Sequence, residues 1–513
     1  MDITLIRPPI YTKGFQSAHR VPYLGVAYIG AMARKMGHRV DIVDMCGEDI
    51  DRVERVGNRY LSYGMPFSEL KHRLKPSDVF GFSCSFSQDW VFNRELIRYI
   101  RKLFPKSIFV AGGEQITALP DYCMTDCPDL DVCVRGEGDI TFTKLLEALL
   151  EKRDLSEIPG LTFRSPDRKD LLSTPTANRL QDIDDLPYPA WDLIPMENYL
   201  SRRLNYHIDR GRTIPIMMSR GCPYQCSFCS NPTMWGNRWT PRNPARVADE
   251  IDHFTKIFKA DNFIFSDLTS TVNQNNLSQF CEELLARSRH ITWQIPFSRT
   301  ESFDETTLRL MYDAGCRDLD FAVESGSPEL LKTVKKGNDP RRMTALIKRS
   351  LSIGFNCTAI VIIGLPQENG KTALQTFALT LKLALLGLHE IIVTLFTPYP
   401  GSQLFRDLLN QKKITLNDDY FLNLFSITDI SQSTSWSEHF SPRCLRALRI
   451  LLIGCFYATM LLSHPNRLLR LIINILDGTS PSRLSMIGRR ILTNLKGYLS
   501  PARATVGPIP DRD

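Results

Sequence analysis

The chain has 513 residues, a length that suggests about two to four domains rather than one. Hydrophobic residues make up 43% and charged residues 23% of it, as in ordinary globular proteins. The net charge of +7 is spread over the whole length without a sustained basic block, so the composition does not indicate a partner nucleic acid.

Cysteine usage and the N-terminus predict the compartment. The 13 cysteines occupy irregular positions, which fits a reducing compartment better than a disulfide framework. The first residues lack the basic start and apolar core of a secretory signal, so we expect a cytoplasmic protein. The most apolar run, 450–462, has 13 residues between Arg446 and Arg449 on one side and Arg467 and Arg470 on the other. It is too short to span a bilayer.

Residues 1–155 alternate short apolar runs with longer helical patterns. This alternation predicts an α/β domain with a doubly wound parallel sheet, Rossmann-like, whose ligands bind past the carboxyl ends of the strands. The predicted strands are 3–6, 40–43, 79–83, 108–111 and 132–134, and the predicted helices are 24–36, 90–104 and 141–150.

A second alternating series occupies residues 211–405, after a proline-rich linker at 156–210. Six β/α repeats predict a partial TIM-like (β/α)6 barrel with its catalytic residues on the carboxyl-end rim. One helix is expected to begin at Pro244 with Asn243 as its N-cap. Residues 406–513 are predicted to be mainly helical, with a disordered tail at 508–513. The predicted barrel strands are 214–219, 262–265, 293–297, 318–323, 357–363 and 391–396.

Three cysteines follow the first predicted barrel strand in a C-x3-C-x2-C pattern: Cys222, Cys226 and Cys229. Thiolates are the soft ligands of iron–sulfur clusters, and a stable cluster usually has four of them. A loop with only three leaves one iron open for a small molecule, which indicates a catalytic cluster. A structural zinc site would need a fourth Cys or His, but the nearest histidines, His207 and His253, are 15 or more residues away.

The cysteine loop, with Phe228 just before its last cysteine, resembles the [4Fe–4S] motif of the radical S-adenosylmethionine (SAM) enzymes. The resemblance implies that SAM chelates the open iron. One electron, supplied by an external donor of flavodoxin or ferredoxin type, then cleaves SAM to methionine and a 5′-deoxyadenosyl radical. Several residues at strand ends match positions with which the family binds SAM, and a structural cap or buried ion pair is the alternative role of each. They are Asp267, Arg299, Glu324, Ser325, Gly364 and Pro366, and the resemblance implies that Phe228 of the cysteine loop contacts SAM as well.

The N-terminal domain carries a second resemblance. Ser83-Cys-Ser85, followed after 26 residues by Gly112-Gly113, is similar to the S-x-L and G-G elements of cobalamin-binding domains. Such domains often use an upstream histidine as the lower ligand of cobalt. Here Cys46 stands at that position, which implies cobalamin with a displaced base and no protein ligand, or else a domain that has lost the cofactor. The implied contacts are Ser83, Ser85, Gly112, Gly113, Glu114, Arg135, Gly136 and Glu137.

The order of the two domains resembles the cobalamin-dependent radical SAM enzymes. This implies a methyltransferase acting on an unactivated carbon, or in second place a phosphorus, of a small-molecule, natural-product or lipid-like substrate. A cyclase or rearrangement enzyme on a tetrapyrrole or other polycyclic substrate is one alternative. A cobalamin-binding sensor without turnover is another, which the intact cysteines oppose.

Two further features of the sequence carry open interpretations. The apolar helices at 445–475 are predicted either to be core that closes the barrel, or to form a wall for a hydrophobic substrate or a peripheral membrane contact. Cys123 and Cys127 repeat the C-x3-C spacing without a third cysteine two residues on, and are expected to be ordinary thiols.

Overall fold

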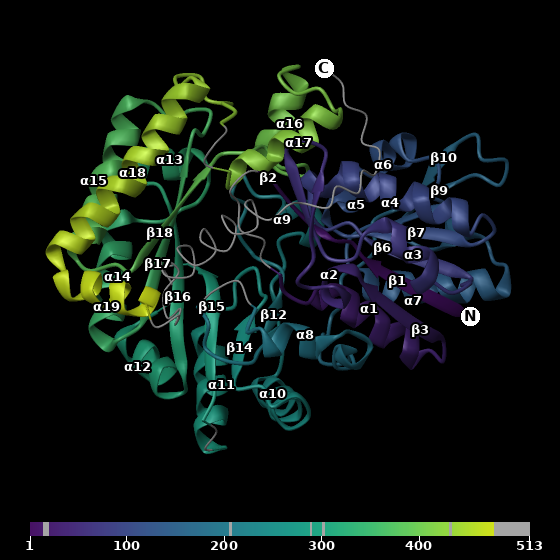
Figure 1. The fold of residues 1–513 in the computed structure, drawn as a ribbon, viewed down its shortest axis with the longest axis horizontal. Coiled ribbons are helices and arrows are strands. Elements are labelled where there is room, and N and C mark those ends of the chain that lie inside the picture. Colours follow the sequence, from purple (N-terminus) through teal and green to yellow (C-terminus); the bar gives the residue numbers. More distant parts are fainter. Residues whose placement is uncertain (14–19, 205–207, 288–289, 300–302, 430–432, 477–513) are drawn as a thin grey trace.

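The computed structural model describes residues 1–13, 20–204, 208–287, 290–299, 303–429 and 433–476. Two α/β units lie side by side, an N-terminal one drawn in purple and blue and a second drawn in teal and green, with the last two helices of the described chain along the outer edge of the second (Figure 1). His207 and the predicted disordered tail 508–513 lie outside the described residues.

The N-terminal unit contains the predicted parallel sheet. Its predicted strands are β1 (Asp2–Arg7), β3 (Arg39–Asp44), β6 (Val79–Ser83), β7 (Ile108–Gly112) and β8 (Val132–Val134). Its helices are α1 (Leu24–Lys35), α2 (Met45–Glu48), α3 (Phe67–Arg73), α4 (Trp90–Leu103), α5 (Glu114–Ala118), α6 (Pro120–Asp126) and α7 (Gly138–Glu151). The five strands are parallel neighbours in the order β8-β7-β6-β1-β3, so the predicted fold class is confirmed. Their apolar runs are buried, as expected for a sheet covered on both faces.

Five strands of this region are not predicted from the sequence. Strands β9 (Leu161–Arg164) and β10 (Leu171–Ser173) add to the sheet antiparallel beside β8, so the sheet extends into the segment predicted as linker. Strands β2 (Ile10–Lys13), β4 (Val53–Val56) and β5 (Tyr60–Tyr63) form a separate antiparallel sheet. A short helix, α8 (Met196–Ser201), ends the connector.

The second unit is the predicted partial barrel. Its strands are β11 (Thr213–Ile216), β14 (Asn262–Phe265), β15 (Thr292–Ser298), β16 (Cys316–Glu324), β17 (Asn356–Ile363) and β18 (Glu390–Leu395). Its helices are α9 (Asn231–Trp235), α10 (Pro244–Phe258), α11 (Gln274–Ala286), α12 (Glu305–Asp313), α13 (Pro328–Thr333), α14 (Pro340–Ile353) and α15 (Gly370–Leu385). All six strands are parallel and follow one another in chain order, which confirms the predicted repeats. The Asn243 side chain accepts a hydrogen bond from the Ala245 N–H and caps α10 as predicted.

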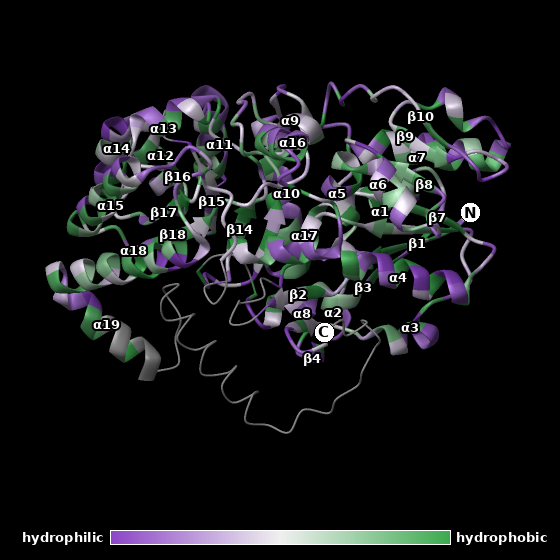
Figure 2. Cartoon of the chain, turned by 90° about the horizontal axis from the view of Figure 1, so that it is seen from above, coloured by the Kyte–Doolittle hydropathy of each residue, from purple (hydrophilic) through white to green (hydrophobic). Residues whose placement is uncertain are grey.

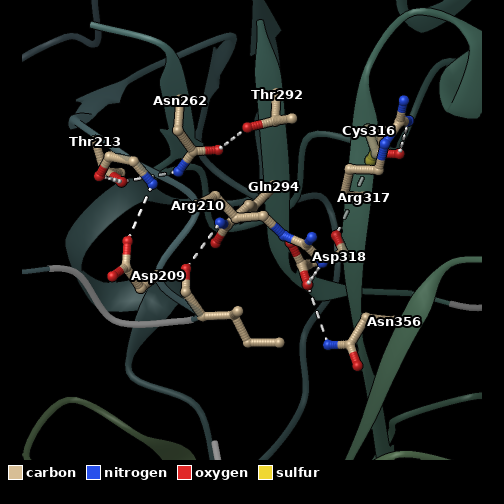
Figure 3. Close-up of polar contacts among 12 residues, drawn as sticks. Asp209, Arg210, Thr213, Asn262, Thr292, Gln294, Cys316, Arg317, Asp318 and Asn356 are labelled. Atoms are coloured by element: carbon tan, nitrogen blue, oxygen red, sulfur yellow. Dashed lines mark hydrogen bonds and ion pairs between the residues drawn. The ribbon is translucent and has the colours of Figure 1, made fainter. Parts of the chain in front are cut away.

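Polar side chains tie the barrel strands together at their amino ends (Figure 3). Asn262 donates to Thr213 Oγ1 at 2.8 Å and accepts from Thr292 Oγ1 at 2.8 Å, which links three neighbouring strands. Asp318 on β16 pairs with Arg210 at 2.9 Å and accepts from Asn356 at 3.0 Å. Because this end of a barrel contributes to stability rather than chemistry, the opposite rim is where the functional residues are expected.

The C-terminal helices are α16 (Gln403–Asn410), α17 (Asp418–Asn423), α18 (Pro442–Ser463) and α19 (Pro465–Leu476). The helix that contains the apolar run 450–462 is longer than the run itself, because α18 has 22 residues and the Ser441 side chain caps its start. Among the described residues it is the one helix long and apolar enough to cross a membrane by length and composition, with 28% of its most apolar window buried. Its inner side chains, among them Leu445, Phe456 and Met460, belong to the barrel core beside α15 and β18.

Candidate active site

The three cysteines lie on a loop that leaves β11 at the carboxyl-end rim. The short strands β12 (Ser219–Arg220) and β13 (Thr240–Pro241) pair antiparallel and close the base of this loop. Gly221 has φ +82°, and a Cβ there would lie 2.2 Å from the Arg238 carbonyl oxygen, so the turn into the cysteines requires glycine. The Ser227 N–H donates to the Val334 carbonyl at 3.0 Å, which pins the middle of the loop to the barrel.

The cysteines are partly or fully buried and are surrounded by cations. The Cys229 N–H donates to the Cys226 carbonyl at 3.0 Å in a tight turn, and burial raises the pKa of Cys229 to about 12. The Arg299 guanidinium lies 3.8 Å from Cys226 Sγ and stacks 3.5 Å over the Tyr224 ring. Since thiolates bind iron while thiols do not, nearby positive charge stabilises the form that a cluster requires.

A [4Fe–4S] cluster and a mononuclear metal ion require different arrangements of their ligands. Among the described residues no group of three or more His, Cys, Asp and Glu side chains converges tightly enough to hold one metal ion. A [4Fe–4S] cluster places each thiolate on a different iron, so its cysteines stand farther apart than the ligands of a mononuclear zinc site.

A cavity of about 310 Å³ lies past the carboxyl ends of β6, β7 and β8 in the N-terminal sheet. Glycines line much of it, and a Cβ added at Gly25 would meet no atom within 4 Å, so the backbone there borders open space. At Gly112 the nearest atom to an added Cβ is 3.8 Å away. A slot bordered by bare backbone suits a bulky, flat ligand that approaches the main chain closely.

The cavity and the cysteine loop share a wall. Arg220 of β12 and Met234 and Trp235 of α9 line the cavity from the barrel side, and α9 begins two residues after Cys229. Ser230 Oγ donates a hydrogen bond to Glu114, which lines the cavity from the sheet side. A ligand in the cavity and a cluster on the loop are therefore neighbours.

Both units match known families. Residues 15–146 match the B12 binding domain, and residues 216–380 match the radical SAM superfamily. An uncharacterized methyltransferase of Pyrococcus horikoshii is 28% identical over 85% of this chain and 89% of its own. The anaerobic magnesium-protoporphyrin IX monomethyl ester cyclase of Rubrivivax gelatinosus is 26% identical over 80% and 70%. The solved structure of the radical SAM methyltransferase TsrM from Kitasatospora setae, with cobalamin and a [4Fe–4S] cluster bound, has the same fold, with a TM-score of 0.64, 16% identity and coverage of 89% and 88%.

The chain belongs to the cobalamin-dependent radical SAM enzymes. Its cofactors are those of the family, a [4Fe–4S] cluster, SAM and cobalamin, as the sequence predicts. The structure shows where each of the predicted site residues lies.

Most of the residues predicted to contact cobalamin line the cavity: Ser83, Ser85, Gly112, Gly113, Glu114, Gly136 and Glu137. Arg135 is not among the residues lining it, and its guanidinium donates to the Leu161 carbonyl at 3.0 Å, where it joins the sheet to the connector. Gly113 has φ +114°, and an added Cβ would lie 2.6 Å from the Cys84 carbonyl oxygen. This glycine is therefore needed for the close approach of two strand ends, whether or not a ligand is bound.

The segment aligned with the histidine motif lies outside the cavity lining. Asp44 forms a buried ion pair with Arg7 at 3.0 Å and accepts from the Tyr199 hydroxyl at 2.7 Å. Cys46 is buried beside them, and burial raises the pKa of its thiol. This placement favours the expectation that no side chain at position 46 binds cobalt.

Glu324, predicted to contact SAM, lies near Phe228 of the cysteine loop, which is predicted to contact SAM as well. Glu324 ends β16 in the left-handed region, with φ +59°, next to a register shift. Its carboxylate pairs with the buried Lys336 ammonium at 2.8 Å, and this ammonium lies 6.0 Å from the Phe228 ring. A non-glycine residue held at positive φ next to a buried ion pair is typical of a functional site, where the surrounding structure supports backbone strain.

Asp267 supports the corner from which the loop leaves the barrel. Its buried carboxylate accepts from the Met218 N–H at 3.0 Å and from Ser219 Oγ at 2.5 Å. Burial raises the pKa of Asp267 to about 6. Since both oxygens have protein donors, the structure favours the capping role that the sequence leaves open for this residue.

The remaining predicted SAM contacts lie farther along the rim. Ser325 Oγ hydrogen-bonds Thr376 Oγ1 of α15 at 2.8 Å. The Gly364 N–H donates to Glu368 at 2.5 Å, and an added Cβ would lie 2.8 Å from Leu445 of α18. The Pro366 carbonyl accepts from the Glu438 N–H at 3.0 Å. The structure therefore places these residues between the barrel rim and the helices that cover it.

Sequence reasoning misses several residues at this junction. Trp235 and Met234 follow the cysteines in Asn231-Pro-Thr-Met-Trp235, where an apolar pair on a short helix is the available signal. Asp89 lies on the turn after Ser85, and burial raises its pKa to about 8 although Arg7 acts in the opposite direction. Its Oδ1 has no hydrogen-bond partner among the described residues. No sequence motif predicts that an aspartate at this position is buried.

Replacement of Cys226 by alanine should abolish the cluster. We expect the wild-type enzyme to take up about four irons per chain on anaerobic reconstitution, and Cys226→Ala to lose most of them together with reductive SAM cleavage. Iron analysis and chromatography of 5′-deoxyadenosine measure both. Cys123→Ala is the matched control, because Cys123 is a buried thiol in the core of the N-terminal unit. Wild-type 5′-deoxyadenosine formation by Cys226→Ala would contradict the assignment.

Filling the glycine-lined cavity should block cobalamin. Gly25→Leu adds its Cβ where no protein atom lies within 4 Å and extends the side chain from the cavity lining, so we expect cobalamin affinity to fall about tenfold or more with little change in melting temperature. Absorbance titration under reducing conditions measures the affinity. Gly370→Leu is the matched control, since Gly370 also begins a helix and borders open space but lies outside the cavity lining. Equal affinity in Gly25→Leu and wild type would place cobalamin elsewhere.

Proposed function

We propose that the enzyme is a methyltransferase that acts on an unactivated carbon of a small-molecule, natural-product or lipid-like substrate. The observation that supports it most strongly is the shared wall between the glycine-lined cavity and the cysteine loop. A methyl group carried by cobalamin in the cavity and a radical generated at the cysteine loop could then both reach one substrate atom.

The cofactors supply the chemistry, and the residues of the chain orient and shield it. When bound, cobalamin would carry a transferable methyl group, and the cluster with SAM would supply a carbon-centred radical able to remove a hydrogen atom from the substrate. Arg299 and Lys336 place positive charge next to the thiolates. Trp235 and Met234 cover the side of the cavity that faces the loop. An apolar cover of this kind excludes water from a radical site and limits side reactions.

The relatives support this proposal and also a second candidate. The Pyrococcus relative is named a methyltransferase, whereas the Rubrivivax relative, at nearly the same identity, is a cyclase. Oxidative cyclisation of a polycyclic substrate is therefore the alternative reaction of the same site. A sensor without turnover is the alternative from another class, and the complete cysteine set with its cationic surroundings opposes it.

Radical SAM enzymes need a reductant, and we propose a cytoplasmic flavodoxin or ferredoxin as the donor. The cysteine loop lies at the junction of the two units, where Arg220 pairs with Asp139. An acidic one-electron carrier would thus approach the rim of this junction rather than the sheet side.

Isotope labelling separates the two reactions. The purified enzyme is incubated anaerobically with SAM carrying a trideuterated methyl group, a reductant and a metabolite extract of the source organism. We expect a product that has gained the trideuterated methyl group, and Cys226→Ala in the same extract as a control without product. A product formed without deuterium would favour the cyclase, and absence of SAM cleavage with fully loaded enzyme would favour the sensor.

A further inference from the structure

Three helices form one outer face of the barrel unit. Helices α15, α18 and α19 lie together beside the edge strand β18, on the side away from the N-terminal unit (Figure 1). Helices α15 and α18 run parallel, because Leu445 lies against Gly364 just before α15, and His464 lies 3.2 Å from the Leu385 carbonyl at its end. We call these three helices the outer face.

The inner side of α18 is fixed to the protein. Leu452, Phe456 and Met460 are buried in the barrel core. Arg449 is buried as well, and its guanidinium donates to the Ile427 and Asp429 carbonyls, each at 3.1 Å. If α18 left the barrel, its buried apolar side chains would be exposed and the Arg449 guanidinium would lose its carbonyl acceptors. We therefore infer that α18 does not cross a bilayer, although its length and composition would allow it.

The outer side of α18 is apolar along several turns. Leu462 is 84% exposed, Ile450 and Leu451 are about half exposed, and the exposed positions between them are Gly454 and Ala458. The neighbouring helices continue the apolar surface, with exposed side chains at Leu374, Leu385, Leu468, Leu469 and Ile473. Green hydrophobic segments follow α18 and α19 along the edge of the molecule in Figure 2. Exposed apolar surface of this extent marks an interaction site.

The charge of the outer face has one sign. The sequences of α15, α18 and α19 contain no Asp or Glu. They contain exposed basic side chains near the helix ends, at Lys371, Lys382, Arg443 and Arg446. Two copies of such a face would repel one another, whereas an anionic lipid surface provides both an apolar layer and negative charge.

We propose that the outer face docks the enzyme on the surface of an anionic lipid bilayer, with α15, α18 and α19 lying in the interface. The apolar side chains enter the boundary between headgroups and acyl chains, and the basic side chains contact the headgroups. This surface is separate from the cysteine loop, so binding to lipid does not depend on the reaction that the enzyme catalyses.

The test uses the full chain and vesicles of defined composition. Co-sedimentation is measured with vesicles of equal parts phosphatidylcholine and phosphatidylglycerol, and with phosphatidylcholine alone. We expect binding to the anionic vesicles that is about tenfold weaker without phosphatidylglycerol and falls with added salt. Leu462→Glu and Leu451→Glu should each weaken binding to the anionic vesicles by about tenfold or more, because each places a carboxylate among apolar side chains facing the lipid.

Ile257→Glu on α10 is the matched control, since Ile257 is 54% exposed and lies outside the outer face. It should bind like the wild type, and the melting temperatures of all variants should agree because every altered side chain is largely exposed. Failure of the wild type to bind anionic vesicles would overturn the proposal, as would unchanged binding by Leu462→Glu. A wild-type dimer in solution that Leu462→Glu dissociates would also overturn it, because the occupant would then be a second copy.

Discussion

A buried ion pair between the two units positions the cysteine loop. Arg220, two residues before Cys222, pairs with Asp139 of α7 at 2.6 Å, and both side chains are buried. Removing one partner of such a pair leaves an uncompensated buried charge and typically costs about 3–5 kcal/mol. Because Arg220 also lies on the strand pair that closes the loop, the place of the cysteines depends on the packing of the N-terminal unit.

The same contact region joins the glycine-lined cavity to the cysteine loop. Arg220 lines the glycine cavity, and its guanidinium lies 5.8 Å from the Trp235 ring on the helix that follows the cysteines. The Glu114–Ser230 hydrogen bond connects the cavity rim to the other end of the loop. Neither unit could provide this geometry alone, since each contributes one wall and one set of ligands. The junction between the cavity and the cysteine loop therefore depends on the packing of the two units against each other.

Local spacing allows much of this site to be predicted from the sequence. Ser83 and the glycine pair lie where buried strands end, and the cysteine loop follows β11. Parallel strands bring their carboxyl ends to a common edge. A side chain whose hydrogen-bond partner is distant in the chain cannot be placed from local spacing. Arg135 follows a strand as the others do, yet it turns to the carbonyl of Leu161, and that strand could not be predicted from the local pattern.

The C-terminal helices show a related limit. A run of apolar residues ends at Arg449 in the sequence, but in the fold that arginine binds backbone carbonyls in the interior and the helix continues to Pro442. An arginine can end an apolar segment or be buried within it. Which of the two occurs depends on whether hydrogen-bond acceptors from elsewhere in the chain reach its guanidinium. Likewise, Asp267 and Glu324 both follow strands, and only their neighbours show that one supports the loop and the other faces a buried lysine.

The proximity of the two cofactors can be measured directly by electron paramagnetic resonance of the anaerobic, fully loaded enzyme. If they share the wall formed by α9, reduction of the cluster should broaden the cobalt(II) signal of cobalamin and speed its relaxation through magnetic coupling. The Cys226→Ala enzyme loaded with cobalamin should lack this effect. A cobalt(II) signal whose width and relaxation are the same with the cluster oxidised and reduced would contradict a single active site between the two units.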